Sequence, residues 1–467
     1  MCNNVNDTII TNLNVEVFRL KIINSTEVGF NEIKRLLTKK SFDEVELSPK
    51  ILEANKKIFG ADLTAVEIVR KIVNDVRTNG DKAVVDYTKM IDGIELNPAD
   101  LLVTQAEFEA AESSVDSEVV KSLKRAAENI KQFHQEQLPK SWITYREYGS
   151  ILGQAIVPLE RVGIYVPGGT AAYPSSVLMN AIPAKVAGVG EIVMMSPAKT
   201  GAINPYVLIA AKLAGVDKIY KIGGAQAIAA MAFGTETIPR VNKITGPGNI
   251  FVTLAKKEVY GHCDIDMLAG PSEILIIADE TANPLYTAAD MLSQAEHDPL
   301  ACSIVITTNS ELANKVAKEV QIQLEKLPRH EIAAASIERN GLIVVAKDMD
   351  EAVDFANTSA PEHLELLVNE PFNVLPKIKH AGAVFLGHYS PEPLGDYLAG
   401  PNHVLPTGGT AKFYSVLNVE TFLRRQSIIS YTKPSLIDAA EDIKRLAHAE
   451  GLDAHAAAIQ KRIEHVQ

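Results

Sequence analysis

Hydrophobic residues recur at helical spacing in the first third of the chain. Four aliphatic side chains fall at positions i, i+3, i+4 and i+7 of one predicted helix: Val69, Ile72, Val73 and Val76. Asn79 and Gly80 follow them and are typical of a helix end. Thr104 and Glu107 have the spacing of a capping box, which begins another helix. The pattern therefore predicts that residues 60–137 are largely helical.

The pattern changes near residue 155, where short apolar runs begin to alternate with helical stretches. A first series of strands is predicted at 161–169, 191–196, 218–222 and 241–245, and a second at 272–279, 302–308, 341–346 and 382–387. This alternation is typical of βαβ units, in which helices cover the faces of a parallel sheet. The segment from about residue 418 is predicted to be mostly helical and to form an arm.

These elements predict an α/β fold with two doubly wound, Rossmann-like units, a helical N-terminal part and a C-terminal helical arm. The chain has 467 residues, which is more than one ordinary hydrophobic core accommodates. The predicted parts are an N-terminal extension with one helix candidate near 29–39 (1–60), a first α/β domain (61–160 plus 271–417), a second α/β domain (161–270) and the arm (418–467).

Composition narrows the class of protein. Hydrophobic residues make up 46% of the chain and the net charge is −12, which argues against nucleic acid or an anionic membrane as a partner. The three cysteines, at positions 2, 263 and 302, are widely spaced and predict no disulfide framework. The N-terminus does not have the pattern of a secretory signal, and no long apolar run predicts a membrane span. We therefore expect a soluble, cytoplasmic protein.

Three glycine-rich turns come directly after predicted strands, at 167–170, 223–226 and 246–249. Tyr165, Gln226 and Asn249 lie in or beside them. Such turns let a ligand approach the backbone at the carboxyl ends of parallel strands. They also serve as plain connections, and neither GxGxxG nor GxxxxGK[ST] occurs. Both interpretations remain open on this pattern.

A possible metal site begins in the segment "LSQAEHDP". Gln294 and His297 are three residues apart, so both project from one face if this segment is helical. Asp396 lies in a loop rich in glycine and proline, and His455 follows a glycine that precedes a new helix. Zinc takes about four nitrogen, oxygen or sulfur donors. Spacing alone does not establish the site, because no tight HxxxH or CxxC pattern occurs and glutamine is a poor metal ligand.

Glu362 and His363 are adjacent at the start of a strand-like run in "PEHLEL". A carboxylate and an imidazole in one cleft serve two different proton transfers. Neighbouring residues of a strand point to opposite faces, so both side chains reach one site only if the chain turns there. A surface pair whose hydrogen bonds are satisfied is the alternative interpretation.

Eight motifs taken together resemble those of the histidinol dehydrogenase family, in the same order along the chain. They are "VGIYVPGG", "GGAQAIAAMAFGT", "GPGN", "DMLAGPSEILIIAD", "LSQAEHDP", "PEHLEL", "GDYLAGPNHVLPTGG" and "AEGLDAH". The resemblance runs from about residue 60 to the C-terminus, and the first forty or so residues have no match.

The resemblance implies the last step of histidine biosynthesis, in which two NAD oxidise L-histidinol through histidinal to L-histidine. It implies one zinc ion per subunit, which orients the substrate, with Gln294, His297, Asp396 and His455 as ligands that also face the substrate. Matched by motif, the remaining site residues are His363 as general base, Glu362 as activator of water, Ser272 and Glu450 as substrate contacts, and Tyr165, Gln226 and Asn249 as NAD contacts.

The resemblance also implies a homodimer in which the C-terminal arm crosses to the partner. Glu450 and His455 would then complete the site of the other subunit. Some relatives on this scaffold oxidise other polar alcohols, such as sulfonated diols, and a dehydrogenase of that kind is the alternative. Glu450 together with His455 favours histidinol.

Overall fold

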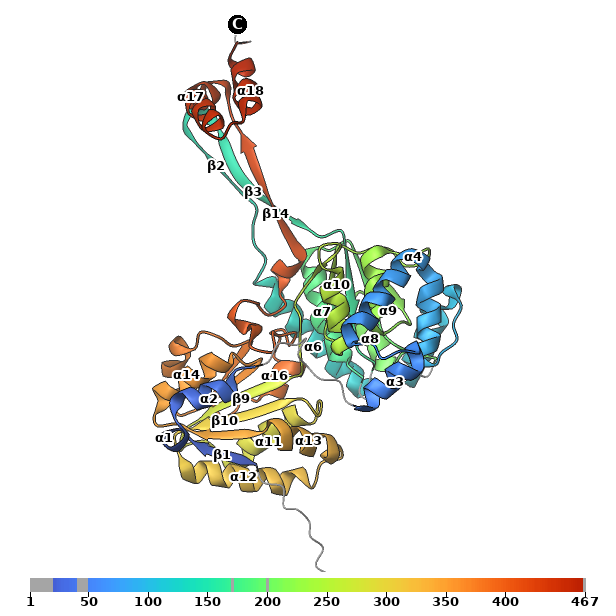
Figure 1. Ribbon diagram of the computed structural model, residues 1–467, viewed down its shortest axis with the longest axis vertical. Helices are drawn as coiled ribbons and strands as arrows, with labels where there is room; N and C mark the ends of the chain where they lie inside the picture. The colour runs from blue at the N-terminus through green and yellow to red at the C-terminus, as the bar shows by residue number, and fades with distance from the viewer. Residues whose placement is uncertain (1–19, 40–48, 169–171, 199–200, 465–467) are drawn as a thin grey trace, which may run out of the picture. The chain divides into compact units, whose positions relative to one another are not determined.

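The computed structural model describes residues 20–39, 49–168, 172–198 and 201–464. Contacts divide the chain into two units (Figure 1). The first unit contains Met1–Ala65, Asn249–Leu254 and Met267–Val416. The second unit contains Val66–Gly248, Ala255–Asp266 and Leu417–Gln467.

The first unit is built on a six-stranded parallel sheet of order β1-β11-β10-β9-β12-β13. Its strands are β1 (Lys21–Asn24), β9 (Glu273–Ala278), β10 (Cys302–Thr307), β11 (Leu342–Val345), β12 (His363–Leu367) and β13 (Ala383–Leu386). Its helices are α1 (Ser25–Val28), α2 (Phe30–Leu37), α3 (Pro49–Phe59), α11 (Pro284–Ala295), α12 (Ser310–Leu324), α13 (His330–Asn340), α14 (Met349–Ser359), α15 (Pro371–Val374) and α16 (Glu392–Tyr397).

Helices cover both faces of this sheet. One hydrophobic cluster joins the strands to α11, α12 and α13, and a second cluster joins them to α2 and α14. All six residues of β9 are buried, which explains why its sequence is a continuous apolar run rather than an alternating one. The predicted second series of strands and the doubly wound arrangement are confirmed.

Strand β1 was not predicted. It pairs in parallel with β11 at the edge of the sheet, where Ile23 opposite Val344 is buried. Four residues are too few to show a period, so the tertiary pairing rather than the local pattern makes this segment a strand. The predicted helix near 29–39 is confirmed as α2, and Ile33 and Leu37 anchor it in the core.

The second unit contains a five-stranded parallel sheet of order β6-β5-β4-β7-β8. Its strands are β4 (Arg161–Tyr165), β5 (Glu191–Met195), β6 (Lys218–Tyr220), β7 (Lys243–Thr245) and β8 (Asp264–Ile265). The helices of this part of the chain are α4 (Ala65–Asp92), α5 (Gln105–Ser114), α6 (Ser117–Gln135), α7 (Pro174–Ala187), α8 (Pro205–Ala214), α9 (Gly224–Phe233) and α10 (Ile250–Val259).

The helical pattern of residues 60–137 is confirmed in this unit. Gly80 adopts φ 54° and interrupts α4 where the sequence predicted a helix end. Thr104 and Glu107 form the predicted capping box at the start of α5. The turn at 167–170 lies only partly within the described residues, since Gly169 and Thr170 fall outside them.

The C-terminal arm differs from its predicted form in one respect. It contains the helices α17 (Lys433–Ala449) and α18 (Asp453–Glu464), as expected, but it begins with an eight-residue strand, β14 (Leu423–Ser430). This strand pairs antiparallel with β3 (Ile151–Pro158), which also pairs with β2 (Trp142–Tyr145). The pairing partner lies about 270 residues earlier in the chain, so no local pattern shows it. Among the described residues, no helix combines the length and the hydropathy that a membrane span requires.

Candidate functional site

The predicted catalytic pair is anchored to the peptide of one residue, Glu273, at the start of the neighbouring strand β9. The backbone N–H of Glu273 donates to Oε2 of Glu362 at 2.8 Å. The carbonyl oxygen of Glu273 lies 2.9 Å from Nδ1 of His363. Glu362 precedes β12 and His363 begins it, so the chain turns there and both side chains reach the same place. The surface-pair interpretation is wrong, because both residues are buried.

This contact determines the tautomer of His363. A carbonyl oxygen only accepts hydrogen bonds, so Nδ1 carries the proton and Nε2 carries the lone pair. Burial lowers the pKa of His363 to about 3, so the imidazole is neutral near pH 7. Nε2 is buried and has no hydrogen-bond partner among the described residues. The ring therefore presents an unprotonated nitrogen lone pair to a bound molecule.

The pKa of Glu362 is raised, whereas that of His363 is lowered. Burial raises the pKa of Glu362 well above its ordinary value, the carboxylates of Glu273 and Asp396 add to the increase, and the N–H of Glu273 opposes it. A carboxyl group with a raised pKa is a stronger base when it is ionised. The pair thus combines a neutral imidazole with a carboxyl group whose proton affinity is increased.

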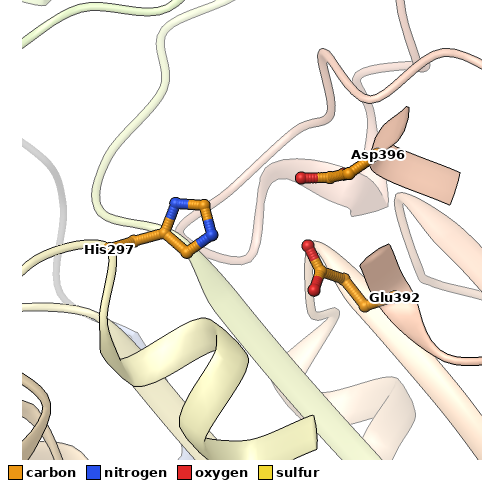
Figure 2. A group of neighbouring side chains, drawn as sticks. All are labelled: His297, Glu392 and Asp396. Carbon is orange, nitrogen blue, oxygen red and sulfur yellow. The ribbon is translucent and has the colours of Figure 1, made fainter. Parts of the chain in front are cut away.

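Three possible metal donors converge beside this pair. Side-chain donor atoms of His297, Glu392 and Asp396 all lie within 4.8 Å of one another. Figure 2 shows the imidazole of His297 facing the two carboxyl groups. Asp396 also lies 3.8 Å, through Oδ1, from Nε2 of His363. His297 follows α11, whereas Glu392 and Asp396 belong to α16.

Gln294 adds a second observation that fits a metal ion. The side chain is fully buried on α11, and neither amide atom has a hydrogen-bond partner among the described residues. An unsatisfied buried amide costs roughly 1–3 kcal/mol, so a ligand for its oxygen is expected. His297 is one turn further along, and its N–H donates to the carbonyl of Gln294. Nitrogen and oxygen donors of this kind suit a divalent ion such as zinc.

Glu392 was not predicted, and hydrogen bonds link this donor to two further buried acids, Glu365 and Asp290. Its N–H donates to Oε1 of Glu365 at 2.7 Å, and Glu365 hydrogen-bonds to Asp290. Burial and Asp396 raise the pKa of Glu392 to about 8. Burial raises the pKa of Asp290 to about 6. The sequence contains a signal for Asp290 and for Glu365. Asp290 is four residues before Gln294 on a helix, and Glu365 is two residues after His363 on a strand, so each lies on the same face as a predicted site residue.

Of the other predicted substrate and metal residues, Ser272 belongs to the same unit as this donor group, whereas Glu450 and His455 belong to the second unit. Ser272 is half-buried before β9, and its carbonyl accepts the N–H of Cys302. Glu450 follows α17 and His455 lies in α18, and both are exposed residues of the second unit. The donor group of the first unit contains neither of them.

The predicted nucleotide contacts lie mostly at the carboxyl edge of the second sheet. Tyr165 ends β4, and its hydroxyl oxygen accepts the N–H of Gly224 at 3.1 Å. Burial raises the pKa of Tyr165 to about 12, so the phenol stays neutral. Gln226 is fully buried in the first turn of α9, and both its amide atoms lack a partner among the described residues. A second unsatisfied amide thus lies where open α/β sheets bind ligands.

Asn249 and Gly246 have structural roles of their own. Oδ1 of Asn249 accepts the backbone N–H groups of Phe251 and Val252 and so caps α10. Gly246 adopts φ 111°, and a Cβ there would lie 2.2 Å from the carbonyl oxygen of Tyr165. Connection geometry therefore accounts for this glycine.

Comparisons with known proteins agree on one family. A family model described as histidinol dehydrogenase matches residues 59–463. The histidinol dehydrogenase of Heliobacterium mobile is 58% identical over 397 residues, which cover 85% of this chain and 93% of the relative. That of Bacillus thuringiensis subsp. konkukian is 55% identical over 421 residues, 90% of this chain and 97% of the relative.

The fold agrees as well. The crystal structure of histidinol dehydrogenase from Elizabethkingia anophelis superposes with a TM-score of 0.86 at 37% identity, covering 95% of this chain and 98% of that one. The match in sequence and in fold extends over nearly the whole of both chains. The chain therefore belongs to the histidinol dehydrogenase family.

Proposed function

We propose that this protein oxidises L-histidinol to L-histidine through histidinal, with two NAD as electron acceptors, in the last step of histidine biosynthesis. The observation that carries the proposal is the free Nε2 of His363, which is buried, unprotonated and 3.8 Å from a carboxylate of the candidate metal group. Oxidation of an alcohol requires a base at this kind of position, because the hydroxyl proton leaves as the hydride departs.

Gln294, His297 and Asp396 would hold zinc together with His455 from a second copy of the chain. Zinc, when bound, orients the imidazole and the amine of histidinol and so fixes the reacting carbon. The buried amide of Gln294 supports this assignment, because an oxygen ligand without a partner gains one when the ion binds. Ser272 and Glu450 would contact the substrate, and a carboxylate suits its cationic amine.

His363 acts first in this mechanism. Nε2 takes the proton of the substrate hydroxyl while hydride leaves the same carbon, which gives the aldehyde. The hydrogen bond from Nδ1 to the carbonyl of Glu273 keeps the ring in the required tautomer and stabilises the imidazolium that forms.

Glu362 acts in the second oxidation. Its carboxylate takes a proton from water, and the hydroxyl adds to the aldehyde carbon. The hydrate would then pass the second hydride to NAD and its remaining acidic proton to solvent, which gives the carboxylate product. The raised pKa of Glu362 makes it a better base for water than an ordinary carboxylate. The N–H of Glu273 holds Oε2, which leaves the other oxygen for this task.

Tyr165, Gln226 and Asn249 would contact NAD, which accepts a hydride in each oxidation when it is bound. The support is the unsatisfied amide of Gln226 and its position at the carboxyl edge of a parallel sheet. A neutral Tyr165 hydroxyl suits a donor to phosphate or ribose oxygen.

We also propose a homodimer with shared sites. The sheet of β2, β3 and β14 exposes large apolar side chains that a second copy would cover, among them Trp142, Ile143, Tyr145 and Ile429. Glu450 and His455 are likewise exposed on the arm. A crossing arm would bring them to the partner's site and bury this surface.

One assay tests the function directly. Zinc-loaded protein is given L-histidinol and NAD, and NADH and histidine are both measured, with a chelator-treated sample as the control. We expect two NADH for each histidine and little NADH after chelation. Negligible turnover of L-histidinol beside rapid turnover of a sulfonated diol would favour the alternative dehydrogenase.

A complementation assay tests the shared site. His363→Asn subunits are mixed with His455→Asn subunits under conditions that exchange them. Each mixed dimer then has one intact site, so part of the activity should return. If exchange is demonstrated by a size-tagged subunit and no activity returns, the sites are built within one chain.

A further inference from the structure

The catalytic pair depends on Glu273, and the side chain of Glu273 has an unusual environment. It is 6% exposed, and Oε1 accepts the backbone N–H of Gly408 at 3.1 Å. Oε2 is buried and has no partner among the described residues. A buried carboxylate with one hydrogen bond is costly unless a cation lies nearby.

That cation is Lys39, which comes from the chain segment before the region that the family model matches. Nζ of Lys39 lies 3.8 Å from Oε1 of Glu273 and donates to Sγ of Cys302 at 3.0 Å. Only 18% of the lysine side chain is exposed. Cys302 and Glu273 are paired residues at the starts of β10 and β9, so Lys39 lies against two adjacent strands.

The segment that carries Lys39 is anchored independently of the lysine. Strand β1 pairs with β11, and Ile33 and Leu37 of α2 are fully buried in the core. Burial alone lowers the pKa of Lys39, but Cys302 and Glu273 raise it above its ordinary value overall. The ammonium group is therefore charged at neutral pH.

We propose that Lys39 is a positioning residue for the oxidation: its ammonium group holds the Glu273 carboxylate, and the Glu273 peptide in turn holds Glu362 and His363. This inference rests on the proposed function, because it assigns those two residues their catalytic roles. It gives the N-terminal segment a task in the active site. Without Lys39 the Glu273 side chain loses this contact and moves, and the Glu273 backbone, which holds both catalytic residues, shifts with it.

The experiment compares Lys39→Met with Lys39→Arg in the zinc-loaded, full-length protein, using initial rates at varied L-histidinol. We expect kcat of Lys39→Met to fall about ten- to a hundredfold while KM changes less than about twofold, since misplaced catalytic groups affect the chemical step. Lys39→Arg should restore most of the rate. Lys34→Met is the matched control, because this lysine of α2 lies over the ring of Phe30.

A double-mutant cycle shows whether Lys39 acts through Glu273. In a Glu273→Gln background, Lys39→Met should change kcat less than about twofold, because no charge is left to hold. Unchanged kcat in Lys39→Met, or equal losses in the two backgrounds, would overturn the proposal. The wild-type protein separates the two hypotheses: if it does not oxidise L-histidinol, the proposed function fails, whereas a fully active Lys39→Met variant refutes only the role of Lys39.

Discussion

Replacing Asp290 by asparagine should make the fold more stable at neutral pH and leave it nearly unchanged near pH 4. Asp290 is 8% exposed on α11 and hydrogen-bonds to Glu365, whose own buried carboxyl group lies beside it. Burial raises the pKa of Asp290 from 3.8 to about 6. The folded state therefore releases this proton less readily than the unfolded chain does.

The sign and the size follow from linkage. Below the pKa that Asp290 has in the unfolded chain, near 4, the carboxyl group is protonated in both states and does not reduce the free energy of unfolding. As the pH rises toward 6, the unfolded chain ionises first, so the native state loses stability across this window and stays less stable above it. A difference of roughly two pKa units corresponds to about 3 kcal/mol as an upper value. Asparagine keeps the shape and a hydrogen bond to Glu365 but does not ionise.

Urea unfolding at pH 4.5 and pH 7.5, followed by far-UV circular dichroism with a chelator present, measures the effect. The variant should lose less stability than the wild type between the two values, by up to about 3 kcal/mol. Asp354→Asn is the matched control, because Asp354 is exposed on α14 of the same unit. An identical pH dependence for wild type and Asp290→Asn would refute the reasoning that this carboxyl group is held in its neutral form by burial.

Three further substitutions have expected effects on activity or on stability. His363→Asn should reduce L-histidinol oxidation by about 10²- to 10⁴-fold with zinc content unchanged by metal analysis, and near-normal turnover would contradict its role as base. Glu362→Gln should slow histidinal oxidation more than histidinol oxidation. The wild-type histidinal rate should rise with pH through the raised pKa of Glu362, and the variant should lose that dependence; equal losses in both oxidations would count against the assignment. Gly246→Ala should destabilise the fold by roughly 1–3 kcal/mol in urea unfolding, because its Cβ would lie 2.2 Å from the Tyr165 carbonyl at φ 111°. Gly270→Ala, which meets only an ordinary 3.5 Å contact, should change stability much less.

Local sequence patterns predict much of the architecture. Periods of 3.6 residues identify the helices between residues 60 and 137, and the capping box at Thr104 marks a boundary correctly. Fully buried strands such as β9 stand out as apolar runs, and their alternation with helices indicates parallel sheets. These features are determined by residues that are close in sequence, so they can be predicted from the sequence alone. The eight motifs and their order also identify the family.

The tertiary structure decided the rest. The rule that ligands bind at the carboxyl ends of parallel strands suits Tyr165 and Gln226, but the proposed catalytic pair, Glu362 and His363, lies at the amino end of β12, beside the start of β9. Strand β14 exists because β3 offers it a pairing edge.

The buried polar groups show the same dependence on the folded chain. The meeting of Glu392 with His297 and that of Lys39 with Glu273 carry no local signal, since the two residues of each pair are 95 and 234 positions apart in sequence. Nor does a sequence show that Gln294 and the Nε2 of His363 are buried without a partner. Local pattern determines which segments become helices and strands. Burial and the convergence of distant side chains arise only when those segments pack together, and they set the proton affinity and the metal-binding capacity of the site.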